Sequence, residues 1–131
     1  MISVINGIEM GYEDVGKGLP VLFVHAFPLN RTMWAPQVSA LVERCRCVAP
    51  DLRGFGETQA QTPFSMDQYA DDLVALLDHL HIDRVVLVGC SMGGYAAFAL
   101  LRRHASRVRA LVLSDTRATA DTEEGRARRR V

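Results

Sequence analysis

The residues with the clearest chemical potential form the pentapeptide Gly89-Cys90-Ser91-Met92-Gly93, which matches the pattern G-x-S-x-G. An apolar, β-branched run precedes it, and a stretch rich in Ala and Leu with helical spacing follows it. In such a strand-to-helix turn a serine hydroxyl is lifted out of the sheet, and the helix N-terminus directs free NH groups at the same place. The pattern therefore predicts Ser91 as a nucleophile for acyl transfer and the backbone NH of Met92 as a donor to the developing negative charge.

Gly89 and Gly93 support this interpretation, because residues without a side chain leave room for neighbouring backbone at the turn. The alternative is an ordinary turn of small residues between a strand and a helix. Cys90 is interpreted as a packed thiol and not as the nucleophile, because Ser91 holds the central position of the motif.

A serine hydroxyl reacts poorly unless a histidine, oriented by a carboxylate, removes its proton. Downstream of Ser91 the sequence contains His104, which lies about 20 Å away along the predicted helix at a rise of ~1.5 Å per residue. His79 and His81 close the preceding helix and are interpreted as helix-end or surface residues. Asp115 is interpreted as an acidic residue that ends a strand. None of these three histidines is suited to remove the proton of Ser91.

The elements that position Ser91 are predicted from short β-branched runs that alternate with longer stretches of helical spacing. The first two strands meet at Asn6-Gly7, a pair typical of tight antiparallel hairpins. The later alternation favours a mostly parallel sheet with helices on both faces. Strands are predicted over 2–5, 8–13, 20–25, 45–50, 84–88 and 108–113, and helices over 33–43, 65–80 and 92–104.

Two further segments follow predicted strands: His25-Ala26-Phe27-Pro28 and Asp51-Leu52-Arg53-Gly54-Phe55-Gly56-Glu57-Thr58. The two glycines of the second segment allow its backbone to turn sharply where the strand ends, the edge at which open α/β sheets place their sites. We expect this segment to have a structural role at the rim of the site.

Together with the Ser91 motif, these segments resemble the N-terminal half of a serine hydrolase of the α/β-hydrolase superfamily, in the family's order and spacing. The first is similar to the family's H-G-x-P segment, with Ala26 where glycine is common. The second is similar to D-x-R-G-x-G-x-S, with Thr58 in the serine position. The resemblance implies that the backbone NH of Phe27 joins that of Met92 as an oxyanion donor, and that His25 is a packed structural residue.

The resemblance also implies a function: the nucleophile-bearing half of a hydrolase of carboxylic esters or lactones, working through an acyl-enzyme without a cofactor. Within the family the chain most resembles 3-oxoadipate enol-lactonase-like esterases and cofactor-free haloperoxidases, so haloperoxidase or perhydrolase activity stays open. Two alternatives are a binding module that has lost the chemistry and an inactive fragment.

The resemblance covers the chain as far as residue 116, which we expect to be the N-terminal portion of the core domain. Residues 117–131 are expected to start a cap or a mobile linker. The family's last strands and cap are then missing, which leaves residues 108–113 as an open apolar edge. We therefore expect a second chain that carries the C-terminal half, with the catalytic histidine and an Asp or Glu.

The composition narrows the classes of partner. Fifteen Lys and Arg balance fifteen Asp and Glu, so no overall field favours nucleic acid or an anionic membrane. Three cysteines without a disulfide framework or paired metal-ligand spacing favour a reducing, cytoplasmic setting. The sequence has no signal-peptide pattern, no apolar run of membrane-spanning length and no Walker A motif. We expect a small-molecule ester or lactone as substrate, and no cofactor, metal, nucleic acid or membrane.

Overall fold

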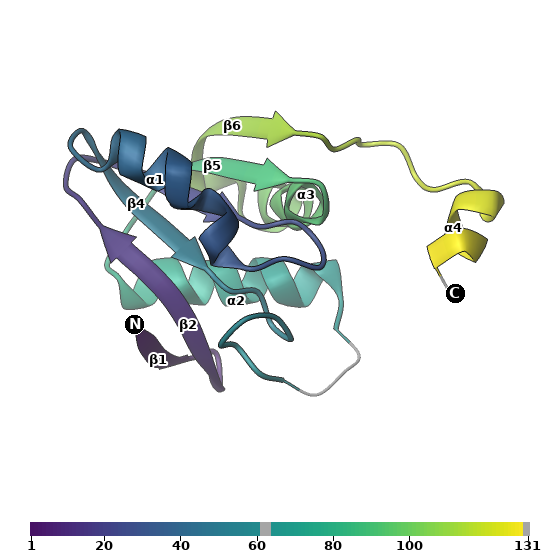
Figure 1. The fold of residues 1–131 in the computed structure, drawn as a ribbon, viewed down its shortest axis with the longest axis horizontal. Helices are drawn as coiled ribbons and strands as arrows, with labels where there is room; N and C mark the ends of the chain where they lie inside the picture. The colour runs from purple at the N-terminus through teal and green to yellow at the C-terminus, as the bar shows by residue number, and fades with distance from the viewer. Residues whose placement is uncertain (61–63, 130–131) are drawn as a thin grey trace.

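A twisted sheet forms the centre of the computed structural model, which describes residues 1–60 and 64–129 (Figure 1). In this part of the chain six strands lie in the order β1-β2-β4-β3-β5-β6. The strands are β1 (Ile2–Ile5), β2 (Ile8–Val15), β3 (Leu19–Val24), β4 (Cys45–Pro50), β5 (Val85–Cys90) and β6 (Val108–Ser114). The helices are α1 (Ala35–Leu41), α2 (Met66–His79), α3 (Met92–His104) and α4 (Glu123–Arg129), with 3₁₀ turns η1 (Arg31–Trp34) and η2 (Ala105–Arg107).

The sheet combines an antiparallel start with a parallel centre, as the sequence predicts. β1 pairs antiparallel with β2 through a turn in which Asn6 and Gly7 both have positive φ, 49° and 77°. β2 is also antiparallel to β4, whereas β4, β3, β5 and β6 run parallel to one another. β3 therefore lies between β4 and β5, and its end at Val24 pairs with Gly89 at the end of β5.

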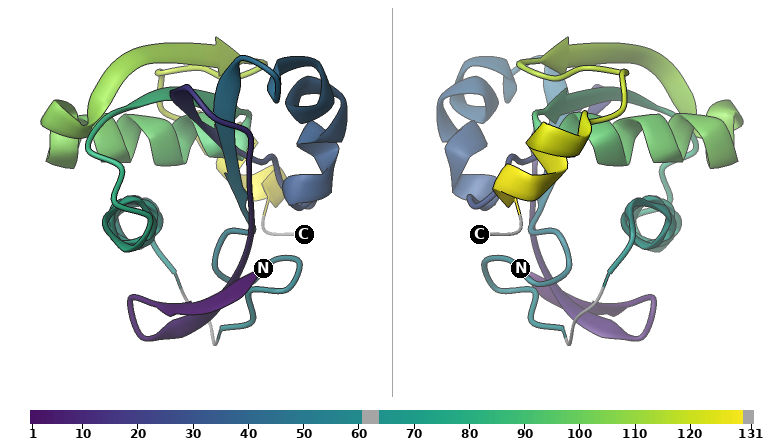
Figure 2. Two further views of the ribbon diagram at one scale, coloured as in Figure 1. Left: turned by 90° about the vertical axis from the view of Figure 1, so that its left-hand side faces the viewer. Right: turned by 90° about the vertical axis from the view of Figure 1, so that its right-hand side faces the viewer.

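Helices cover both faces of the sheet (Figure 2). α2 and α3 pack on one face, over a large core that includes Leu22, Leu76 and Leu87, all fully buried. η1 and α1 pack on the other face, over a smaller core around Phe23 and Trp34, whose ring centroids lie 5.3 Å apart. Because β3 contributes to both cores, its residues are apolar at consecutive positions.

The predicted helix over 33–43 differs from the structure in how it begins. Residues Arg31–Trp34 form a 3₁₀ turn, and the α-helix starts at Ala35. Pro36 lies in the first turn of α1, where its fixed φ suits a helix start and its missing NH removes no helical hydrogen bond. The proline therefore marks the start of the α-helix more sharply than the apolar spacing does.

α4 is a helix that the apolar periodicity does not predict. Five of its seven residues are charged, and Glu124 pairs with Arg128 one turn later. Ion pairs at this spacing stabilise a helix without an apolar face. α4 follows an extended segment and stands apart from the sheet in Figure 1.

β6 forms one edge of the sheet, and within the described residues it pairs with β5 alone. Val112 and Leu113 are 49% and 41% exposed on this strand. Val86 and Val88 of β5 are only half-buried against the smaller core. The β5–β6 end of the sheet thus presents apolar side chains that α1 does not cover.

Candidate active site

Ser91 lies between the last residue of β5 and the first residue of α3, and its backbone has φ 51° and ψ −112°. A residue other than glycine in such a conformation costs about 1–3 kcal/mol and persists only where its surroundings enforce it. Four hydrogen bonds do so here, of which the one from the NH of Tyr95 to Ser91 O is the longest (3.4 Å). The NH of Ser91 donates to Ser114 O (3.0 Å), while Thr116 Oγ1 and the NH of Gly94 both donate to Ser91 O (2.9 Å each).

The two glycines of the motif allow very close backbone contacts around this turn. A Cβ at Gly93 would lie 2.1 Å from Val24 O, and a Cβ at Gly89 would lie 2.6 Å from Gly93 O. The end of β3 therefore touches the first turn of α3. Sequence reasoning missed Gly94, where a Cβ would lie 2.3 Å from Thr116 Oγ1. The only sign of this contact in the sequence was that a second glycine directly follows the motif.

Met92 and Phe27 occupy neighbouring turns at this edge of the sheet. Met92 is the first residue of α3, so its NH points away from the helical hydrogen-bond ladder. Phe27 follows β3 by three residues, and its side chain is 67% exposed. Across residues 1–60 and 64–129, neither backbone NH donates to a protein atom, and the Ser91 hydroxyl has no protein hydrogen-bond partner. The site thus offers a free hydroxyl and two free NH donors.

His25 lies fully buried beneath the turn that contains Phe27. The NH of Leu52 donates to its Nε2 (2.9 Å), so Nδ1 carries the proton and donates to Ala26 O (3.0 Å). Burial lowers the pKa of His25, against the opposing effects of Ala26 O and the Asp51 charge. With both nitrogens engaged, this ring holds the turn together and has no lone pair for the Ser91 proton. Ala26 does not adopt a positive φ, so alanine fits where the family favours glycine.

The buried His25 predicts a specific pH dependence of stability. Because its pKa is lowered on folding, the unfolded chain binds a proton that the folded chain resists. The free energy of unfolding should therefore fall as the pH drops below about 6.5, by at most ~1.4 kcal/mol per pH unit. Urea denaturation between pH 7.5 and 5.5 measures this slope. The slope should be smaller in His25→Gln, and equal slopes in the two proteins would contradict the assignment.

The remaining histidines lie away from Ser91. His104 is at the far end of α3, where its Nε2 lies 3.2 Å from Asp71. His79 packs edge-on against Tyr12, with ring centroids 6.4 Å apart, and His81 is exposed after α2. Within the described residues, none of these rings contacts the Ser91 turn.

The Asp51–Thr58 segment forms a closely bonded loop at the rim. The buried Asp51 carboxylate accepts hydrogen bonds from the backbone NH groups of Arg31 and Glu57 (2.8 Å each). The Arg31 guanidinium forms ion pairs with the side-chain carboxylates of both Asp51 and Glu57. Thr58 Oγ1, also buried, accepts the NH of Gly11 (2.9 Å). The sequence predicts the structural role of this segment, but not its link to Arg31, which is twenty residues earlier.

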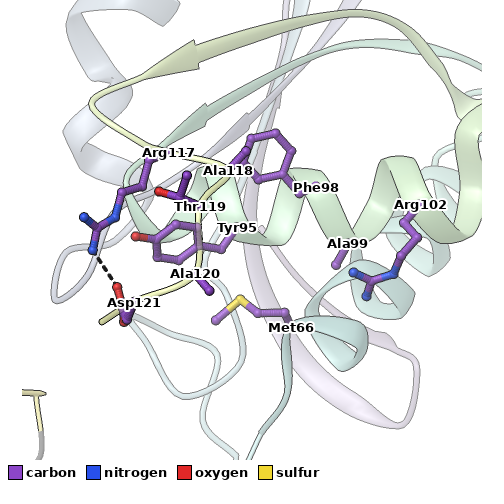
Figure 3. Close-up of a pocket in the computed structure, with 10 residues that line it drawn as sticks. All are labelled: Met66, Tyr95, Phe98, Ala99, Arg102, Arg117, Ala118, Thr119, Ala120 and Asp121. Carbon is purple, nitrogen blue, oxygen red and sulfur yellow. Dashed lines mark hydrogen bonds and ion pairs between the residues drawn. The ribbon is translucent and has the colours of Figure 1, made fainter. Parts of the chain in front are cut away.

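A hollow of about 300 Å³ lies beside α3, between its outer face and residues 117–121 (Figure 3). Ser91 and Phe27 do not line it. Its charged side chains are paired, Arg117 with Asp121 and Arg102 with Asp67. Because these charges are already paired, the hollow is better explained as a packing or solvated surface than as a site for a charged ligand. The hollow is lined by Met66, Tyr95, Phe98, Ala99, Arg102, Arg117, Ala118, Thr119, Ala120 and Asp121.

Comparison with known families identifies this arrangement. Residues 20–130 match the family model described as the alpha/beta hydrolase fold. The chain belongs to the α/β-hydrolase family. The fold predicted from the sequence is thereby confirmed, including its parallel sheet and antiparallel N-terminal hairpin.

Solved structures of this family superpose closely on the chain. A thermophilic esterase from Thermogutta terrifontis is 46% identical with a TM-score of 0.92, over 99% of this chain and 50% of that one. The enol-lactonase from Burkholderia xenovorans LB400 is 32% identical with a TM-score of 0.90, over 98% of this chain and 52% of that one. These matches confirm the resemblance to esterases and enol-lactonases.

Curated α/β-hydrolase relatives carry several names. A non-heme chloroperoxidase, CPO-A1, from Kitasatospora aureofaciens is 40% identical over 111 residues, which cover 82% of this chain and 40% of that protein. Epoxide hydrolase 2 from Siraitia grosvenorii is 41% identical over 111 residues, covering 82% of this chain and 35% of that protein. The chain thus spans well under half the length of these relatives.

The described part of this α/β-hydrolase chain has neither a helix long and apolar enough to cross a membrane nor a group of three His, Cys, Asp or Glu side chains that could hold a metal ion.

Proposed function

We propose that the chain is the nucleophile-bearing half of a serine hydrolase that acts on carboxylic esters or lactones through an acyl-enzyme. The observation that carries the proposal is the positive φ of Ser91 directly before the first turn of α3. The proposal assigns the NH groups of Met92 and Phe27 as the donors to the developing negative charge. Strained residues that several contacts enforce are concentrated at active sites. A small-residue turn without catalytic use has no need of this conformation.

In the proposed reaction Ser91 Oγ attacks the carbonyl carbon while its proton passes to a histidine. The carbonyl oxygen becomes negative and accepts hydrogen bonds from the NH groups of Met92 and Phe27. The C–O bond then breaks, and the histidine protonates the alcohol or enol oxygen, which departs from an ester but stays on the acyl chain of a lactone. Water attacks the acyl-enzyme in the same way, which releases the carboxylic acid and restores the Ser91 hydroxyl.

The serine also argues against the epoxide chemistry for which some relatives are named. If Ser91 opened an epoxide, the product would be an alkyl ether on the serine, which water does not cleave at a useful rate. A carboxylate nucleophile instead forms an ester, which water can hydrolyse. Family membership does not distinguish the two reactions, and a serine at the centre of the motif supports ester hydrolysis over epoxide hydrolysis.

We propose that a second polypeptide or segment supplies the histidine and its Asp or Glu. The exposed Val112 and Leu113 on β6, beside the half-buried Val86 and Val88, support a neighbouring strand and helix there. In this proposal residues 1–116 are the N-terminal portion of the core, and residues 117–131 lead into a cap or linker. Three free cysteines support a cytoplasmic setting.

The similarity to a chloroperoxidase favours one further candidate activity. Hydrogen peroxide in place of water would attack the acyl-enzyme and release a peracid, which can oxidise halide. This perhydrolase reaction uses the same Ser91 and the same NH donors. The remaining alternatives are a binding module without catalysis and an inactive fragment.

The experiment compares the chain alone with the chain joined to the second half of the Thermogutta terrifontis esterase, either fused or supplied in trans. We expect hydrolysis of short p-nitrophenyl esters by the joined form and none by the chain alone. Adding hydrogen peroxide and halide to the joined form, and measuring oxidation of the halide, tests the perhydrolase activity. A folded joined form without esterase activity would overturn the proposed function. Ser91-dependent activity of the chain alone would overturn the need for a second half.

A further inference from the structure

The 51–58 loop contacts the 25–31 turn at three places. At the start of the turn, the NH of Leu52 donates to His25 Nε2 (2.9 Å). At its end, the NH of Arg31 donates to the Asp51 carboxylate (2.8 Å). Between these two anchors, the rings of Phe55 and Phe27 are in contact. The turn that carries the Phe27 NH is therefore held by a loop from a different strand.

Phe55 lies between a buried ring and an exposed one. Its centroid is 5.4 Å from that of His25, with an interplanar angle of 72°, and 5.8 Å from that of Phe27, at 88°. Both contacts have the edge-to-face geometry that aromatic pairs favour. Phe27 is 67% exposed, and among the described residues its ring contacts one other aromatic ring, that of Phe55.

The backbone on either side of Phe55 is closed by hydrogen bonds. The NH of Phe55 donates to Leu52 O, and the NH of Thr58 donates to Phe55 O (2.9 Å each). The NH of Gly54 also donates to Thr58 O (2.8 Å). Phe55 therefore projects from a loop whose own conformation is fixed, as a support for a neighbouring turn requires.

We propose that Phe55 is a positioning residue that fixes the Phe27 backbone NH in the orientation needed to stabilise the negative oxygen of the reaction. This inference rests on the proposed function and adds a role for the 51–58 loop. A donor of this kind is effective only if it is oriented before the charge develops. A misplacement of about 1 Å at such a site can lower the rate ~100-fold.

The first test measures amide hydrogen exchange by NMR in the chain itself, which needs no activity. The NH of Leu29 donates to Ala26 O (2.9 Å) and reports closure of the turn. In Phe55→Leu we expect this amide to exchange at least about tenfold faster, with the amides of β3 and α3 unchanged. Phe55→Tyr keeps the ring and should keep the protection. The matched control is Phe98→Leu, the same change on α3, where the ring lines the hollow beside residues 117–121 and not the 25–31 turn.

The second test measures ester hydrolysis in the joined form described above. Phe55→Leu should lower kcat about tenfold or more with KM unchanged within about twofold, and Phe55→Tyr should restore kcat. Phe98→Leu should leave kcat unchanged even where it lowers the melting temperature.

Three results would overturn the role of Phe55: unchanged exchange at Leu29, equal effects of Phe55→Leu and Phe98→Leu, or a raised KM with normal kcat, which would mark Phe55 as a substrate contact. A joined form that never shows Ser91-dependent turnover would instead refute the proposed function. The exchange result still decides whether Phe55 holds the turn, so the two failures are distinguishable.

Discussion

Ser91→Ala is expected to lower ester turnover of the joined form by at least about 10⁴-fold, because alanine removes the atom that forms the acyl-enzyme. Alanine can occupy the same backbone position, so the melting temperature should change little. Initial rates with a p-nitrophenyl ester measure the loss, and circular dichroism checks the fold.

The matched control is Cys90→Ala at the adjacent position. Cys90 packs against the smaller core on the α1 face of the sheet, so its removal should change turnover by no more than a few fold. If Ser91→Ala retained near-normal turnover while Cys90→Ala lost it, the nucleophile would be the thiol.

Gly93→Ala is expected to cause a large loss of stability. The new Cβ would lie 2.1 Å from Val24 O and 2.8 Å from His25 O, both backbone atoms that no side-chain rotation can move. We expect the free energy of unfolding to fall by about 3 kcal/mol or more, as for other overpacked sites, measured by urea denaturation.

Gly125→Ala provides the comparison for this change. Gly125 lies in α4, where the nearest atom to a new Cβ would be 3.4 Å away, and alanine favours the helix by up to about 1 kcal/mol. A stability change near zero or slightly positive is expected. Equal losses in the two variants would contradict the close contact between β3 and α3.

The sheet and its order along the chain were predictable because each element has a strong local pattern. The strand that becomes β3 is apolar on both faces, Ser65 and Gln68 form the predicted capping box of α2, and Asn6-Gly7 forms the predicted hairpin turn. These signals depend on neighbouring residues alone. α4 was missed for the complementary reason, because a short polar helix held by an ion pair has no apolar periodicity.

The contacts around the candidate site were less predictable, because they join segments far apart in the sequence. The motif indicates a turn at Ser91, but not that Thr116 caps its carbonyl from beyond β6. The Asp51 segment indicates a structured loop. Its contacts with Arg31 and Phe27 form only because β3 and β4 lie side by side in the sheet. Only the folded sheet brings these residues together.

Fluorophosphonate labelling of the joined form, followed by tandem mass spectrometry of the modified peptide, tests the central claim most directly. The reagent reacts with a serine only when the hydroxyl is activated and the negative charge that develops on the phosphoryl oxygen is stabilised. We predict a single adduct on Ser91, abolished in Ser91→Ala and retained in Cys90→Ala. A folded joined form that takes up no label, or carries it on another residue, would contradict the assignment of Ser91 as the nucleophile.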